Sequence, residues 1–177
     1  MTVDTTTRPA PDEHAEYYGK YIALATEPDA LGALERQLAD MLPLLRRLED
    51  TQGAFRYAEG KWSVRQLLGH LIDGERVFAY RAMRFARGDQ SPLPGFDENI
   101  YAAAAGSDRL PVQSLVDELE LMRQSSLALF RGLEPAAWLR RGIANDQEIS
   151  VRALAFIIAG HGRHHVQILK ERYRIGI

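Results

Sequence analysis

Cysteine is absent from the 177-residue chain. Its absence excludes disulfide bonds, thiolate metal ligands and a cysteine nucleophile. Any metal ion would therefore have to be held mainly by nitrogen and oxygen atoms.

The chain also lacks a strong charge of either sign. Its 22 Lys and Arg residues nearly balance its 24 Asp and Glu residues, so the formal net charge is -2. This balance gives no electrostatic reason to bind nucleic acid, and no recognition motif for nucleic acid is visible. We therefore expect no nucleic-acid partner.

Long apolar runs are missing as well. No stretch approaches the roughly 20 apolar residues that a helix needs to span a bilayer. The segment from Met1 to Pro11 has neither the charged start nor the apolar centre of a signal peptide. We expect a cytoplasmic protein without a membrane partner.

What the chain does contain is helical periodicity. Apolar residues make up 46% of the chain, which is enough for a sizeable core. They recur every three or four residues in four long segments, over residues 28–48, 62–87, 111–130 and 150–173. A shorter helix over 13–24 is expected to pack on the outside. The prediction is an all-α fold, with a flexible N-terminus over residues 1–12 and a single four-helix bundle domain over 13–177.

The segments between and within these helices carry further signals. Ser63 and Ser150 are predicted N-caps, and Pro43 is expected to kink or break the first helix near Met41. Residues 140–149 are expected to form a polar loop, because no alternating pattern indicates a sheet. The connection over residues 88–111 is too long for a tight turn, which favours a crossover along the bundle or a lid over one end.

Three histidines lie on helix faces that are predicted to turn inward. His161 and His165 are four residues apart on the apolar seam of the last helix, and His70 lies on the inward face of the second. A buried polar group without a partner costs on the order of 1 to 3 kcal/mol, and a divalent ion would satisfy several imidazoles together. The three are candidate metal ligands. The alternative is that they are hydrogen-bonded core residues.

His164 is the reserve candidate. Adjacent residues point about 100° apart on a helix, so His164 and His165 are not expected to serve together, and His164 is assigned a surface or supporting role. Three protein ligands leave a position open, as in catalytic zinc sites.

Two acidic residues follow His70. Asp73, one turn on, either orients a ligand imidazole or a bound water or pairs with Arg76 or a basic residue of a neighbouring helix. Glu75 points about 140° from His70 and is expected to form an exposed or interhelical ion pair. In the third long helix, Arg123 is expected to lie off the apolar side.

These residues resemble those of the DinB superfamily, specifically its YfiT-like metal-dependent enzymes. The similarity extends from about Tyr17 to Tyr173, and the spacing of His70 from His161 and His165 is its most specific part. Further matching motifs are Trp62-Ser63, the run over 69–76, Pro94-Gly95-Phe96-Asp97-Glu98, Ser150-Val151-Arg152-Ala153 and the run over 160–165.

The resemblance implies a four-helix bundle that holds zinc or nickel on His70, His161 and His165. It also implies a transferase or isomerase that uses a low-molecular-weight thiol, and often a homodimer. One position departs from the pattern. Gly162 stands where close relatives often have an acidic residue directly after the first histidine of the last helix, so any role of that carboxylate is missing here.

Three functional hypotheses remain open at this stage. The first is a metal-dependent enzyme acting on a small molecule, either an S-transferase that uses a thiol or a hydrolase that uses metal-bound water. The second is a binding or stress-response bundle without turnover. The third is a helical oligomer in which the histidines are core residues.

Overall fold

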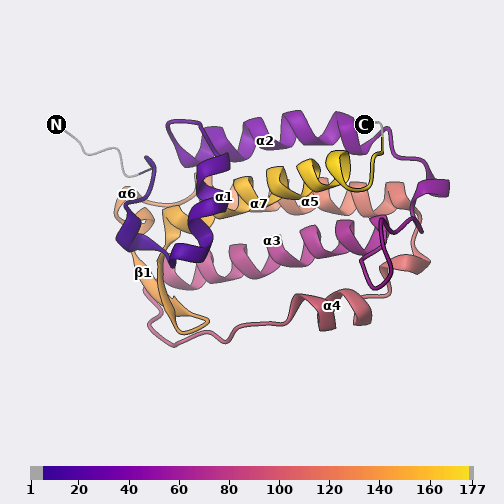
Figure 1. Cartoon of the computed structure of the whole chain (residues 1–177). Coiled ribbons are helices and arrows are strands. Elements are labelled where there is room, and N and C mark those ends of the chain that lie inside the picture. The colour runs from indigo at the N-terminus through magenta and orange to yellow at the C-terminus, as the bar shows by residue number, and fades with distance from the viewer. Residues whose placement is uncertain (1–5, 176–177) are drawn as a thin grey trace.

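The computed structural model describes residues 6–175, and four long helices dominate it (Figure 1). They are α2 (Ala30–Leu45), α3 (Val64–Ala86), α5 (Val112–Arg131) and α7 (Val151–Glu171). Helix α7 packs against α2 and α3, and α5 packs against the same two helices. The predicted four-helix bundle is confirmed.

Shorter elements surround the bundle. Helix α1 (Gly19–Leu24) precedes α2 in the chain and packs on α7. Helix α4 (Glu98–Ala104) packs on α3. The remaining elements are the helix α6 (Pro135–Trp138), the strands β1 (Arg141–Ala144) and β2 (Gln147–Ser150), and the 3-10 turns η1 (Pro11–Glu13), η2 (Glu16–Tyr18), η3 (Asp50–Gln52) and η4 (Ser107–Arg109).

The long connection between α3 and α5 is a crossover. It runs along the outside of the bundle through α4 and returns the chain to the end where α3 began (Figure 1). Helices α3 and α5 therefore run in the same direction. The crossover expected from the length of this segment is confirmed.

The helix ends form where the polar residues predicted them. The Ser63 hydroxyl accepts a hydrogen bond from the Gln66 N–H at 3.0 Å, and the Ser150 hydroxyl accepts one from the Ala153 N–H at 3.1 Å. Each hydroxyl satisfies an N–H group that has no partner within its helix.

Of the kink or break expected from Pro43 near Met41, the break is absent. Helix α2 continues to Leu45, two residues beyond the proline. Proline removes the backbone bond to the carbonyl four residues earlier, and that carbonyl belongs to the exposed Ala39. Water can satisfy it, so the helix tolerates the proline in its last turn.

The polar loop expected over residues 140–149 is instead a β-hairpin. Strands β1 and β2 pair antiparallel, with Arg141 opposite Ser150 and Ala144 opposite Gln147. Asn145 and Asp146 connect them with φ angles of 52° and 60°. Two consecutive positive φ angles are the mark of a type I′ turn, which short polar side chains tolerate. Strands of four residues are too short to show a clear alternation.

The core has two apolar clusters, one near the hairpin and one at the opposite end of the bundle. Between them a polar layer crosses all four long helices. It contains Gln37 of α2, Glu75 of α3, Arg123 of α5 and His161 of α7, all of them buried.

None of the helices described between residues 6 and 175 is long and apolar enough to span a membrane.

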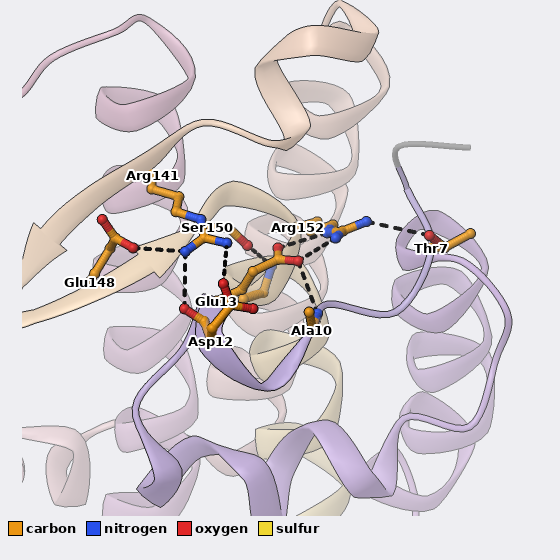
Figure 2. Close-up of polar contacts among 9 residues, drawn as sticks. Thr7, Ala10, Asp12, Glu13, Arg141, Glu148, Ser150 and Arg152 are labelled. Carbon is orange, nitrogen blue, oxygen red and sulfur yellow. Dashed lines mark hydrogen bonds and ion pairs between the residues drawn. The ribbon is translucent and has the colours of Figure 1, made fainter. Parts of the chain in front are cut away.

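The start of the described chain is tied to β1 and to the first turn of α7. Glu13 pairs with Arg152 of α7, and Arg141 of β1 contacts Asp12 and Glu148 (Figure 2). Of the segment expected to be flexible, residues 1–5 lie outside the described residues, and residues 6–12 contact α1, β1 and α7.

Candidate metal centre

His70, His161 and His165 meet in the polar layer. The His161 Nε2 atom lies 2.9 Å from Nε2 of His70 and 3.1 Å from Nε2 of His165. His161 and His165 share one face of α7 because they are four residues apart, and α3 brings His70 to the same point. The helix faces predicted from the sequence thus bring all three rings together.

Burial keeps these rings neutral. His161 is 6% exposed and His165 is 7% exposed. Burial lowers the pKa of His161 and of His165 well below the ordinary value of 6.5, and lowers the pKa of His70 to about 4. All three are therefore neutral near pH 7, the state in which an imidazole can donate a lone pair.

The contacts among the rings cannot all be good hydrogen bonds. A neutral imidazole nitrogen carries either one hydrogen or one lone pair, so His161 Nε2 can satisfy only one of its two close neighbours. In addition, His165 Nδ1 is buried, and no partner for it is found within the part of the chain that the structure describes. Three converging lone pairs are better satisfied by a cation than by one another.

The spacing fits a metal ion. Three nitrogens held about 2.0 to 2.1 Å from a tetrahedral zinc ion would lie about 3.3 to 3.4 Å apart. The observed Nε2 separations of 2.9 and 3.1 Å are slightly shorter, and one candidate ligand atom from each residue lies within 4.8 Å of the others. These residues fit a divalent ion with a small lengthening of the two short Nε2 separations.

Glycines beside the histidines let other elements come close. A Cβ at Gly160 would overlap the backbone carbonyl of Tyr21, so its absence allows α1 to pack directly on α7. A Cβ at Gly162 would overlap the side chain of Gln37. The space that a side chain at 162 would occupy is thus filled by Gln37, which belongs to the polar layer.

That layer corrects the expectation for Arg123 and confirms one of the two for Glu75. Arg123 does not lie off the apolar side of its helix but is 1% exposed. It donates to both carboxylate oxygens of Glu75, from Nε at 2.8 Å and from Nη2 at 3.0 Å. Of the exposed or interhelical ion pair expected for Glu75, the interhelical alternative is therefore present, and it is buried. Gln37 accepts a further bond from Arg123.

A cavity of about 640 Å³ opens in front of the histidines. Its wall is rich in aromatic rings, and Trp62 lies with its ring centroid 4.6 Å from that of His70. Five separate parts of the chain contribute to the wall: the segment around α1, the start and middle of α3, the crossover, the hairpin and α7. The lining residues other than the trio are Ala15, Tyr17, Tyr18, Lys20, Tyr21, Trp62, Phe78, Arg81, Gly95, Phe96, Glu98, Ala144, Asn145, Gln147 and His164.

The reserve candidate His164 and the acidic residue Asp73 have different surroundings. His164 lines the cavity but directs its ring toward Tyr21, at 5.4 Å between centroids, and its contact with His165 is ring to ring. Asp73 lies 3.4 Å from Arg76, the ion pair that was the alternative to a role beside the metal.

Sequence reasoning missed Arg81, a buried charged residue of the cavity wall. A signal for it exists, because Arg81 follows His70 by three helical turns and so lies within about 20° of it around α3. The hairpin residues Asn145 and Gln147 gave no comparable signal, since they reach the cavity only through the folded position of β1 and β2.

The fold and the trio define a helical-bundle protein with a three-nitrogen candidate metal centre facing a cavity. The family comparison places it more closely: the model of the DinB superfamily matches residues 33–169. The chain belongs to the DinB superfamily, as the resemblance predicted.

Curated relatives agree with this assignment. A protein of Oceanobacillus iheyensis is 29% identical over 70% of this chain and 71% of its own length. A protein of Geobacillus thermodenitrificans is 27% identical over 92% of this chain and 88% of its own length. Both carry the name "putative metal-dependent hydrolase".

Solved structures share the fold. YfiT from Bacillus subtilis, described as a probable metal-dependent hydrolase with an unusual four-helix bundle topology, matches with a TM-score of 0.66 and 19% identity over 96% of this chain and 93% of YfiT. A mycothiol-dependent maleylpyruvate isomerase matches with a TM-score of 0.65 and 15% identity over 77% of this chain and 58% of that protein.

Proposed function

We propose that the protein is a metal-dependent enzyme that holds zinc or nickel on His70, His161 and His165. We further propose that it acts on a small molecule, as a thiol-dependent S-transferase or a related metal-dependent hydrolase. The single observation that carries the proposal is the convergence of three Nε2 atoms, 2.9 and 3.1 Å apart, at the base of the cavity.

A set of three histidine ligands suits a catalytic metal site better than a structural one. A structural zinc site is closed by four protein ligands, whereas a catalytic one keeps a position open. The cluster found among the described residues contains only three ligating side chains. When bound, the ion would act as a Lewis acid that favours deprotonation of a thiol or a water near neutral pH.

The protein's own residues would orient and shield the reactants. Trp62 packs beside His70, while Tyr21 and Phe78 contact His161 with ring centroids at 5.3 and 5.9 Å. These rings hold the imidazoles in place and exclude water from their edges. The aromatic wall and the volume of the cavity suit one small organic substrate.

The names of the relatives support both reaction types. The curated relatives are named as hydrolases, and the structural neighbour that uses mycothiol is an isomerase. Activity assays on metal-loaded protein should therefore include hydrolase substrates and a panel of electrophiles with several low-molecular-weight thiols. Turnover that requires both metal and thiol would assign the S-transferase reaction.

The metal assignment is tested by paired histidine variants. We expect His161→Ala to lose stoichiometric zinc and nickel, because it removes the nitrogen that contacts both other rings, while helix content stays largely intact. His164→Ala is the matched control on the same helix and should bind metal as the natural protein does. Elemental analysis and circular dichroism supply the two readouts. Full metal stoichiometry in His161→Ala would refute the assignment.

A non-catalytic metal-binding or stress-response bundle is the second candidate function. The observation in its favour is Gly162, which carries no carboxylate beside His161, with Gln37 filling the adjacent space. Metal-loaded protein that stays inactive toward every thiol, electrophile and hydrolase substrate would favour this alternative.

The homodimer implied by the resemblance stays a prediction. Sedimentation analysis, which measures the mass of the particle in solution, can test it.

A further inference from the structure

Arg81 is a buried cation in the wall of the cavity. It is 3% exposed, and it lies three helical turns after His70 on the same side of α3. Its guanidinium donates to the Pro94 carbonyl oxygen at 2.8 Å. This partner is uncharged, so it does not balance the charge of Arg81.

The other buried arginine is treated differently. Arg123 is 1% exposed, and Glu75 accepts two hydrogen bonds from it. The less buried Arg152 and Arg163 pair with Glu13 and Glu27. Within residues 6–175, no carboxylate lies within ion-pair distance of Arg81. A buried charge without a counter-ion is costly, which indicates that another group completes the pairing.

The charges around the cavity suggest the nature of that group. Two cationic side chains, Lys20 and Arg81, and one anionic side chain, Glu98, line the cavity. Together they give its wall a net charge of +1. Lys20 lies over the rings of Tyr17 and Tyr21, at 3.8 and 4.9 Å from their centroids. The planar fork of a guanidinium matches the two oxygens of a carboxylate.

We propose that Arg81 is the specificity residue for a carboxylate carried by the substrate, so that the enzyme acts on small organic monoanions. The inference rests on the proposed function, because it names the substrate class of the same cavity. The carboxylate would lie at Arg81 and the apolar part of the molecule would contact the aromatic wall. The reacting part would then face the histidines.

The competing interpretation is that Arg81 is structural and only holds the crossover through Pro94. This role would make its replacement destabilising, but it would not make the cavity prefer an anion over a neutral molecule of the same shape. The preference for charge is therefore the informative measurement.

Benzoate and its neutral isostere benzamide are suitable probes. Their binding is measured by calorimetry on the full-length protein after removal of metal with a chelator, so that the carboxylate has no ion to bind. We expect benzoate to bind about tenfold more tightly or better, since a hydrogen bond to a charged group supplies the difference. Arg81→Gln should abolish the preference, whereas Arg87→Gln, which changes an exposed arginine just after the same helix, should keep it.

Several outcomes overturn the inference: equal binding of the two probes, no detectable benzoate binding, or an unchanged preference in folded Arg81→Gln. If Arg81→Gln loses its helix content, the inference is tested instead on the natural protein, by following the NMR resonance of the Arg81 Nε–H. It should shift on addition of benzoate and not of benzamide, and a signal unaffected by benzoate would refute the inference. Because metal is absent throughout, failure here is independent of failure of the histidine variants.

Discussion

The Glu75–Arg123 pair shows how much one buried residue can depend on another. Side-chain exposure is 1% for Arg123 and 4% for Glu75. Removing one member of a buried pair leaves a charge in a medium that solvates it poorly, which is costly even where the intact pair adds little. Gln37 and the Leu34 carbonyl also accept from Arg123, so this arginine joins three helices.

We predict that Glu75→Gln lowers the free energy of unfolding by about 3 to 5 kcal/mol, because the Arg123 charge stays buried without its counter-ion. Glu35→Gln is the matched control: its pair with Arg131 is 50 to 57% exposed, so its loss should cost less than about 1 kcal/mol. Urea denaturation measures both. Equal losses in the two variants would show that burial does not set the strength of the pair.

At the scale of elements, the contact of α1 with α7 places Tyr21 against the metal centre. Tyr21 is 7% exposed, and its ring packs edge to face on that of His161. The backbones approach this closely only because residue 160 has no side chain. Close packing of α1 on α7 therefore depends on this glycine. In a helix interior a glycine costs roughly 1 kcal/mol of stability relative to alanine.

We predict that Gly160→Ala destabilises the protein by about 1 to 3 kcal/mol, the usual cost of overpacking, although alanine is normally the better helix former. The added Cβ would overlap the Tyr21 carbonyl and push α1 away. Gly132→Ala is the control, since a Cβ there would lie at an ordinary 3.5 Å from the Ala128 carbonyl oxygen. Thermal unfolding compares the two, and a Gly160→Ala variant as stable as the natural protein would contradict the close packing.

Elements differ in how well the sequence predicts them. The long helices could be predicted, because their apolar periodicity and the caps at Ser63 and Ser150 act within a few residues. The hairpin could not, because it depends on tertiary contacts: the Leu93 N–H donates to the Ile143 carbonyl at 2.9 Å, and the Asn145 N–H donates to the Leu93 carbonyl at 3.0 Å. These bonds join β1 to the crossover, which no local pattern reveals.

At the scale of the whole molecule, the site combines predictable and unpredictable parts. The convergence of His70, His161 and His165 follows from helix faces, because His161 and His165 lie one turn apart on α7. His70 lies on the inward face of α3, which packs against α7. The pairing of Arg123 with Glu75 and the position of Arg81 in the cavity wall depend on how α3, α5 and the crossover pack. Such contacts are set by the three-dimensional arrangement of distant segments, so hydrophobic periodicity gives no information on them.

Contacts between segments that are distant in the sequence also hold the beginning of the described chain in place. Glu13 in η1 accepts hydrogen bonds from Arg152 in the first turn of α7 and from the Ala10 N–H at 2.9 Å (Figure 2). Thr7 contacts Arg152 in the same cluster. A segment more than a hundred residues away from α7 in the sequence thereby packs beside its start, and it leads directly to the tyrosines of the cavity wall.

We predict that acid weakens the contact between Glu13 of η1 and the first turn of α7. Burial alone would raise the pKa of the Glu13 carboxyl, but the hydrogen bonds from Arg152, Ala10 and Ser150 outweigh it and lower the pKa from 4.5 to about 2. A carboxyl whose pKa is lowered by folding contributes stability above its unfolded pKa and loses it as the pH falls through its folded pKa. The stability advantage of the natural protein over Glu13→Gln should therefore be full above pH 4.5 and shrink between pH 4.5 and about 2. Denaturation across this range measures the difference, with Glu16→Gln, an exposed neighbour, as the control. An advantage that stays constant with pH would mean that the charge of Glu13 does not hold the segment in place.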